Sequence, residues 1–204
     1  MKRAILVTFL ILLIDQLVKF WIKTHMCIGQ SFEIFGPWSQ IHFIENNGMA
    51  FGMEFAGRFG KIFLTVFRAI AIGAIGWYLY TLIKKGANKW LVVVMSLILA
   101  GAAGNLIDSA FYGLIFSEST PFDVAQIFPH GGGYGTFLHG KVVDMLYFPM
   151  MHGHFPAWLP FWGGEEFEFF SPVFNIADSS ITVGVLALLV FQKKLFAKPE
   201  GIEK

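Results

Sequence analysis

Long apolar runs alternate with polar segments along this chain of 204 residues, and four of the runs are long enough to cross a membrane. They cover residues 4–22, 61–83, 90–107 and 174–192. A helix of about 20 residues, rising about 1.5 Å per residue, spans the roughly 30 Å hydrocarbon core of a bilayer. The last run becomes almost wholly apolar at Ile181 and ends at Lys193 and Lys194, as expected at a charged interface. The pattern predicts a membrane α-helical fold with four transmembrane helices in a single domain, residues 1–204.

The segments between the runs follow a different pattern. Residues 24–60 mix Gly, Pro and polar residues with short alternating stretches, of which residues 39–45 are the clearest. Such alternation predicts short β-strands, and the following Asn46-Asn47-Gly48 is a turn signal. Residues 109–172 contain no apolar run of 18 residues. We therefore expect a small β-rich cradle at 24–60 and a long non-spanning region at 109–172.

Lys and Arg are unevenly distributed between the two sides that four spans would create. The two ends and the loop at 84–89 carry nine of the 15 basic residues: Lys2, Arg3, Lys84, Lys85, Lys89, Lys193, Lys194, Lys198 and Lys204. The longer opposite side carries only Lys23, Arg58, Lys61 and Lys141. Because cytoplasmic loops are enriched in Lys and Arg, we expect both termini in the cytoplasm. This orientation places both long segments, and with them Asp108, Asp144 and Asp178, on the extracytoplasmic side.

Composition agrees with a membrane protein and argues against other classes. Only 14% of the residues are charged, 55% are hydrophobic and the mean hydropathy is +0.61. Soluble domains carry about 25% charged residues. The formal net charge is +1 and no basic face is evident, so we expect no nucleic-acid partner. The single cysteine, Cys27, excludes an intrachain disulfide framework and a Cys-rich metal site.

The first apolar run is interrupted by two charged residues, Asp15 and Lys19. Lys2 and Arg3 precede the run as in a secretory signal peptide. However, the interruption and the lack of a small-x-small cleavage site indicate a retained helix. Residues four apart share a helix face, so Asp15 and Lys19 can pair. We favour a structural ion pair that orients the helix in the bundle over a direct chemical role.

Acidic residues near the ends of the later runs are the candidates for chemistry. Asn175 and Asp178 share a face at the start of the last helix. The same spacing recurs with Asn105 and Asp108 at the end of the third run, and Asp144 follows a pair of valines. A carboxylate at a membrane boundary is costly and suggests a functional site, although Asp178 taken alone could equally be an interfacial helix cap.

Convergence of these acids would permit aspartyl peptide hydrolysis. Two carboxylates held close together cannot both ionise easily, so one keeps a proton and the pair can act as general acid and base on water. No span carries a His-Glu-x-x-His or Cys cluster for zinc, and Ser179 and Ser180 have no His in a span to serve as base. Four extramembrane histidines lack a diagnostic metal spacing: His130, His139, His152 and His154. We therefore expect neither a metal nor another cofactor.

Five short motifs occur in order along most of the chain. They are Asp15-Gln16-Leu17-Val18-Lys19, Asn46-Asn47-Gly48-Met49-Ala50-Phe51, Gly104-Asn105-Leu106-Ile107-Asp108, Val142-Val143-Asp144 and Phe174-Asn175-Ile176-Ala177-Asp178. Each is a weak signal alone. In this order, on a four-helix hydropathy pattern, they resemble the motifs of the lipoprotein signal peptidase (signal peptidase II) family. The resemblance implies a four-helix bundle with an extracytoplasmic β-cradle.

The resemblance also implies an activity and a set of site residues. Asp144 and Asp178 would be the catalytic dyad of an aspartyl endopeptidase, activating water to cleave a prolipoprotein signal peptide just before its diacylglyceryl-cysteine. The residues implied to support the site or bind substrate are Asn46, Gly48, Asn105, Asp108, Asn175, Asp15 and Lys19. The enzyme would be a monomer, in contact with membrane lipid, in the bacterial cytoplasmic (inner) membrane with its site on the extracytoplasmic side.

Two features depart from the family pattern. The family usually has Arg after Ile-Asp, whereas Ser109 follows Asp108 here, so this cationic contact is either absent or supplied elsewhere, for example by Arg68. Residues 111–139 and 150–170 look like extracytoplasmic insertions. The insertions leave the shape of the substrate entrance open without affecting the dyad.

A transporter or channel component is the main alternative function. It would relay protons or ions through a set of charged side chains: Asp15, Lys19, Arg68 and Asp178. Transporters place such groups near the bilayer midplane, often within internal repeats. Here the key acids lie at the outer ends of the runs and no repeat is found, which favours the peptidase. A catalytically dead scaffold is disfavoured because Asp144 and Asp178 are both present.

Overall fold

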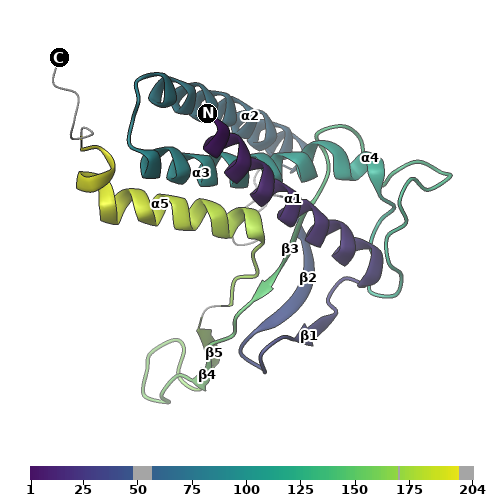
Figure 1. Cartoon of the computed structure of the whole chain (residues 1–204). Coiled ribbons are helices and arrows are strands. Elements are labelled where there is room, and N and C mark those ends of the chain that lie inside the picture. Colours follow the sequence, from purple (N-terminus) through teal and green to yellow (C-terminus); the bar gives the residue numbers. More distant parts are fainter. Residues whose placement is uncertain (48–56, 170, 198–204) are drawn as a thin grey trace.

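The computed structural model describes residues 1–47, 57–169 and 171–197 and is dominated by four long helices (Figure 1). Their bounds are Lys2–His25 (α1), Gly57–Lys84 (α2), Lys89–Ile107 (α3) and Ile176–Leu195 (α5). Each contains a stretch long and apolar enough to cross a membrane. The prediction of a membrane α-helical fold with four transmembrane helices is confirmed.

Helix α3 packs against all three of the other long helices (Figure 1). Its approach to α1 and α5 depends on Gly104, where a Cβ would lie 2.8 Å from Asp15 Oδ2 and 3.1 Å from Ala177 Cβ. Small residues let membrane helices come close enough to associate by packing and polar contacts. Large apolar side chains such as Phe9 and Leu186 are exposed on the outside of the bundle, as lipid-facing positions require.

The helical path of α3 continues past Ile107, where the apolar run ends. It passes through a π-helical turn, Asp108–Tyr112 (η2), and a short helix, Gly113–Ile115 (α4). Within this segment the Ser109 hydroxyl donates to the Asn105 carbonyl oxygen at 3.0 Å, and no proline interrupts it. Single π turns recur at functional sites. Here the first residue of the turn is a fully buried aspartate.

A three-stranded antiparallel sheet lies at the end of the bundle where α1 ends and α5 begins (Figure 1). Its strands, in the order β1-β2-β3, are Ser31–Glu33, Gln40–Asn46 and Val142–Tyr147. The strand predicted at residues 39–45 is confirmed as β2. Its pairing with β3 places Ile44 opposite Asp144 and Asn46 opposite Val142. The cradle is therefore completed by a strand from the second long segment, which the sequence pattern did not predict.

An apolar core and an ion pair hold the sheet against the helices. The buried members of this core are Ile22, Met26, Phe43, Tyr112, Phe116, Ala125, Val143 and Met145. The Lys23 ammonium of α1 pairs with the Glu45 carboxylate of β2 and donates to the Ser119 hydroxyl at 3.0 Å. These contacts fix the sheet, and the residues that it carries, relative to α1.

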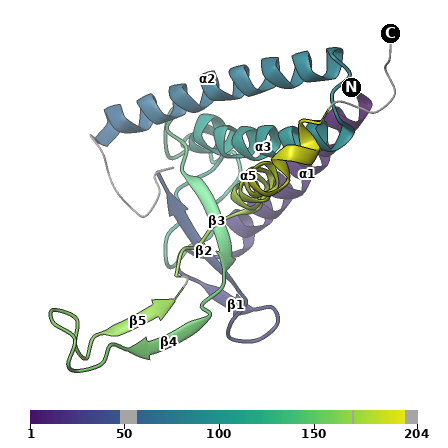
Figure 2. The same cartoon turned by 90° about the vertical axis from the view of Figure 1, so that its left-hand side faces the viewer.

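Two further strands, Met151–His154 (β4) and Glu166–Phe169 (β5), form a separate antiparallel hairpin. Figure 2 shows the hairpin standing clear of the helices and of the three-stranded sheet. It occupies most of the second apparent insertion, residues 150–170. The first apparent insertion folds back on α1, since the Ala125 N–H donates to the Lys23 carbonyl at 3.0 Å.

Candidate active site

Two asparagine side chains connect Asp144 with Asp178. Asp144 is buried on β3, and Asp178 is half-buried in the first turn of α5. The Asn175 amide donates to Asp144 Oδ1 at 2.7 Å. It also donates to Asn105 Oδ1 at 3.0 Å, and the Asn105 amide donates to Asp178 Oδ1 at 2.7 Å. One continuous hydrogen-bonded path therefore runs from one carboxylate to the other.

Asn175 is held in place because it is also the N-cap of α5. Its side-chain oxygen accepts from the Asp178 N–H at 2.9 Å, and the Asp178 carboxylate accepts from the Asn175 N–H at 3.4 Å, which forms a capping box. Just before it, Phe174 pairs with Leu146 of β3 through backbone hydrogen bonds of 3.0 and 2.7 Å. The start of α5 is thus fastened to β3. Asp178 is the third-position member of this capping box, and it accepts a hydrogen bond from Asn105 as well.

The end of β2 supplies another amide to Asp144. Asn46 Nδ2 donates to Asp144 Oδ2, so the two oxygens of this carboxylate accept from different asparagines. The neighbouring Asn47 accepts from Lys61 Nζ of α2 at 3.0 Å. Gly48, which the resemblance implies as a site residue, lies outside the described residues.

A buried ionic cluster, consisting of Asp15, Lys19 and Asp108, lies next to these amides. The expected pair is present, with Lys19 Nζ 3.0 Å from Asp15 Oδ2. Lys19 Nζ is also 2.8 Å from Asp108 Oδ2 and donates to Asn105 Oδ1 at 3.1 Å. All three members of the cluster are 0% exposed. A buried lysine is tolerated when opposite charges and hydrogen bonds satisfy it, and here two carboxylates and an amide do so.

Each acid of the ionic cluster also accepts a backbone N–H from a segment that carries a candidate catalytic acid. Asp108 Oδ2 accepts from the Val143 N–H of β3 at 3.3 Å. Asp15 Oδ1 accepts from the Ala177 N–H of α5 at 2.9 Å. Val143 immediately precedes Asp144, and Ala177 immediately precedes Asp178. The ionic cluster therefore helps to position both segments.

Two site residues were missed in the sequence. Gln16 Nε2 donates to Asp108 Oδ1 at 2.9 Å and to Asp15 Oδ2 at 3.1 Å. The Tyr112 hydroxyl donates to Gln16 Oε1 at 3.1 Å. Their spacing gave a faint signal, because Gln16 adjoins Asp15 and Tyr112 follows Asp108 by four positions. Neither spacing shows that the two helices face each other here.

Burial, and to a lesser extent the negative charge of Asp178, together raise the pKa of the Asp144 carboxyl to about 7. The hydrogen bond from Asn175 acts against this shift by favouring the ionised form. A carboxyl with such a pKa exchanges its proton near neutral pH. That property suits a group that must both give and take a proton.

The position after Asp108 carries no cation, but another basic residue lies in range of the acids. The Ser109 hydroxyl is used within its own helix, donating to the Asn105 carbonyl oxygen at 3.0 Å. Arg68 on α2 is half-buried and interacts electrostatically with all three outer acids, Asp178, Asp108 and Asp144. This placement agrees with Arg68 as the alternative source of positive charge.

Two of the four histidines considered as metal ligands make local contacts. His139 Nδ1 lies 2.9 Å from the Thr136 hydroxyl, and His154 Nε2 lies 3.4 Å from a Glu166 carboxylate oxygen. Across residues 1–47, 57–169 and 171–197, no three His, Cys, Asp or Glu side chains are grouped as a metal site.

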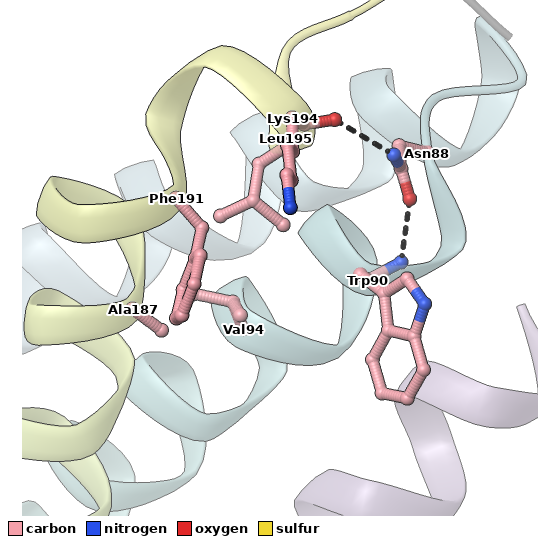
Figure 3. Close-up of a pocket in the computed structure, with 7 residues that line it drawn as sticks. All are labelled: Asn88, Trp90, Val94, Ala187, Phe191, Lys194 and Leu195. Atoms are coloured by element: carbon pink, nitrogen blue, oxygen red, sulfur yellow. Dashed lines mark hydrogen bonds between the residues drawn. The ribbon is translucent and has the colours of Figure 1, made fainter.

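A pocket of about 400 Å³ opens at the other end of the bundle, between α3 and α5 (Figure 3). It is lined by Asn88, Trp90, Val94, Ala187, Phe191, Lys194 and Leu195. The Asn88 side chain accepts from the Trp90 N–H at 2.9 Å and donates to the Lys194 carbonyl at 3.0 Å, which ties the start of α3 to the end of α5. This pocket is separate from the acids, which lie where α5 begins.

Known proteins with similar sequences include several lipoprotein signal peptidases. The family model described as Signal peptidase (SPase) II matches residues 7–193. The lipoprotein signal peptidase of Porphyromonas gingivalis is 54% identical over 182 residues, which cover 89% of this chain and 78% of that protein. The lipoprotein signal peptidase of Amoebophilus asiaticus is 38% identical over 191 residues, covering 92% of this chain and 76% of that protein.

Solved structures described as bacterial membrane enzymes share the architecture. One has a TM-score of 0.61 and 29% identity, covering 95% of this chain and 94% of that chain. Another has a TM-score of 0.60 and 27% identity, covering 100% of this chain and 96% of that chain. Motifs, helices and sequence relatives agree, and the chain therefore belongs to the signal peptidase II family.

Proposed function

We propose that this chain removes signal peptides from lipid-modified prolipoproteins and that Asp144 and Asp178 are its catalytic dyad. The signal peptidase II family consists of aspartyl proteases that process lipoprotein precursors. The choice of these two acids rests on the hydrogen-bonded path Asp144–Asn175–Asn105–Asp178, because it connects the two carboxyls through only two asparagine side chains. The pKa of Asp144, raised to about 7 by burial, supports a proton on that member.

The dyad divides the work of hydrolysis between its members. Ionised Asp178 takes a proton from a bound water as the water oxygen attacks the scissile carbonyl carbon. Protonated Asp144 gives its proton to the carbonyl oxygen, which forms a neutral tetrahedral intermediate. The C–N bond then breaks as the leaving nitrogen takes up the proton held by Asp178 and Asp144 takes back the hydroxyl proton. The products are a free carboxyl end on the signal peptide and a free amine on the lipid-modified cysteine.

The supporting residues act by position. Asn46, Asn105 and Asn175 orient the carboxylate oxygens of the dyad without neutralising them. The ionic cluster fixes the segments that carry the dyad through the Val143 and Ala177 backbone N–H groups. We assign Asp15, Lys19 and Asp108 to this structural role.

The topology is proposed from the distribution of charge. Lys and Arg concentrate near both termini and in the loop at 84–89, which supports cytoplasmic termini and an extracytoplasmic site in a bacterial inner membrane. We further propose that residues 1–204 act as one membrane domain and as a monomer in contact with lipid. Reporter fusions after Lys85 and Lys194 should read cytoplasmic and one after Gly132 extracytoplasmic. An extracytoplasmic signal after Lys85 would overturn this orientation.

The activity is tested with the purified protein and two forms of one prolipoprotein, with and without diacylglyceryl on the cysteine. We expect cleavage of the modified form only, leaving that cysteine as the new N-terminus by mass spectrometry. Equal cleavage of the unmodified precursor would overturn the proposed substrate. An Asp178→Asn variant that cleaves normally would instead overturn the dyad.

A further inference from the structure

The tip of the β4–β5 hairpin presents uncharged aromatic side chains to its surroundings. Residues 155–164 contain no charged side chain. Within them Trp158 is 78% exposed, Phe161 94% and Trp162 56%. Soluble proteins seldom expose several large aromatic side chains together unless the surface binds something. Charged residues return at the base of the tip, where His154 faces Glu166 at 3.4 Å.

The tip is an ordered turn. The Gly164 N–H donates to the Phe155 carbonyl at 3.0 Å, and the Gly163 N–H donates to the Leu159 carbonyl at 3.0 Å. A Cβ on Gly163 would lie 2.7 Å from the Ala157 carbonyl oxygen, so the turn is closed tightly on itself. Phe161 has a φ of 74°, a conformation that costs energy for a bulky residue. The backbone therefore holds an apolar ring outward at a conformational cost.

The hairpin is rooted where the chain enters the membrane. It follows β3 and leads, after a few residues, into the candidate span that begins at Ile176. The pairing of Phe174 with Leu146 fixes the base of the hairpin at the start of α5. Figures 1 and 2 show the hairpin projecting to one side of the helices. Four-residue strands keep the tip close to the membrane face on which α5 begins.

We propose that this tip inserts its aromatic side chains into the lipid interface beside the bundle. Trp is enriched where headgroups meet hydrocarbon, and an amphipathic aromatic body suits that depth. The uncharged tip enters lipid while His154, Glu165 and Glu166 stay in water. Because the tip carries no Lys or Arg, insertion depends on apolar burial and needs no anionic lipid. The insertion thus gives the enzyme a second lipid contact in addition to its spans.

The test uses the full chain in phosphatidylcholine nanodiscs with a single polarity-sensitive fluorophore. The label is attached at Phe161→Cys in a Cys27→Ser background. The control carries the same label at His130→Cys, in an exposed turn outside the hairpin. We expect a blue-shifted emission at position 161, quenching by lipids spin-labelled near the headgroup, and several-fold weaker quenching by aqueous iodide than at position 130.

The possible results distinguish insertion of the hairpin tip into lipid from exposure to water and from binding to another protein. Equal iodide quenching at both positions would overturn the proposal. Protection at position 161 that rises with protein concentration or appears only with substrate, without quenching by spin-labelled lipid, would also overturn it and indicate a protein-binding surface. A second label at Trp158→Cys, read in the same way, covers the case in which the Phe161→Cys chain folds poorly.

Discussion

Two groups of acids lie at the same end of the bundle. They differ in the partners of their carboxylates, which are a lysine ammonium in one group and neutral amides in the other. In the ionic cluster, Asp15 and Asp108 both contact the Lys19 ammonium, and all three side chains are fully buried. In the proposed dyad, Asp144 and Asp178 accept hydrogen bonds from neutral asparagine amides. An ammonium neutralises the carboxylates that it binds, whereas an amide orients a carboxylate and leaves its charge in place.

This difference in partners suits the ionic cluster to a structural role and the proposed dyad to proton transfer. Carboxylates paired with a buried lysine hold helices and strands together. In the proposed dyad, burial and the charge of Asp178 raise the pKa of the Asp144 carboxyl to about 7. Asn105 joins the two groups, because it accepts from Lys19 and donates to Asp178. Substitutions in the proposed dyad should therefore lower turnover, whereas substitutions in the ionic cluster should mainly lower thermal stability.

The largest effect is expected in the dyad. Asp144→Asn and Asp178→Asn should each lower turnover of lipid-modified precursor by about 10²–10⁴-fold or more, because an amide cannot exchange the required proton. The double variant should be scarcely worse than either single one, since members of one catalytic unit are not additive. Turnover is measured at matched enzyme amounts, with Tm as the folding control.

Asp108→Asn is the matched comparison for the dyad variants. It changes an acid of the ionic cluster, so it should lower Tm and reduce turnover less than either dyad substitution. Near-normal turnover in Asp144→Asn together with loss in Asp108→Asn would exchange the roles assigned to these two residues.

Lys19→Met should have the next largest effect, on stability. It leaves the Asp15 and Asp108 carboxylates buried without their ammonium, which costs about 3–5 kcal/mol when a buried pair is broken. Thermal unfolding in detergent reports the change, with Lys193→Met, at an exposed position of α5, as a control expected to unfold like the parent chain. Parental stability with lost turnover would instead give Lys19 a direct part in the reaction.

The effect of pH on turnover and Tm should be smaller than the effect of Lys19→Met, and part of it should depend on Asp144. The carboxyl is protonated below about 7 and ionised above it, so turnover should fall as pH rises through about 7. Tm should fall as pH rises from about 4, the ordinary pKa of an aspartate, to about 7, because over that range the folded chain keeps a proton that the unfolded chain has released. The Tm of Asp144→Asn should lack this component, and an unchanged Tm profile would argue against the raised pKa.

Asn88→Ala should have the smallest effect, far from both acid groups. It removes the N-cap of α3 and the bond to the Lys194 carbonyl, which is worth about 1 kcal/mol. Calorimetry should show this modest loss while turnover, measured at a temperature well below Tm, stays at the parental value. A large loss of turnover would mean that this end of the bundle is coupled to the site.

Elements encoded locally were predictable from the sequence. Four spans followed from apolar run length, and the Asp15–Lys19 pair followed from i, i+4 spacing on one helix. The strand β2 alternates apolar and polar residues, so it was recognised. The strand β3 was not, because its buried Val142-Val143 pair lacks alternation and its pairing partner lies far away in sequence.

The contacts that assemble the site could not be predicted from the sequence, because they too join residues that lie far apart along the chain. Spacing along α3 shows that Asn105 and Asp108 share a face, but it does not show which helix they meet. Asp108 was expected to support the site by hydrogen bonding, but the sequence did not show that its partners would be the Lys19 ammonium and the Val143 N–H of β3. Gln16 and Tyr112 were missed for the same reason. Only the packed bundle determines these partners.

The bond from the Ala177 N–H to Asp15 joins the first membrane helix to the last. During synthesis α1 leaves the ribosome before α5, which is capped by Asn175 and carries Asp178. A chain made only as far as β5 therefore lacks one acid of the proposed dyad, the Asn175 amide that donates to Asp144, and the Ala177 N–H that donates to Asp15. With Asp178 as a member of the proposed dyad, we therefore expect no peptide cleavage from a chain to which α5 has not yet been added.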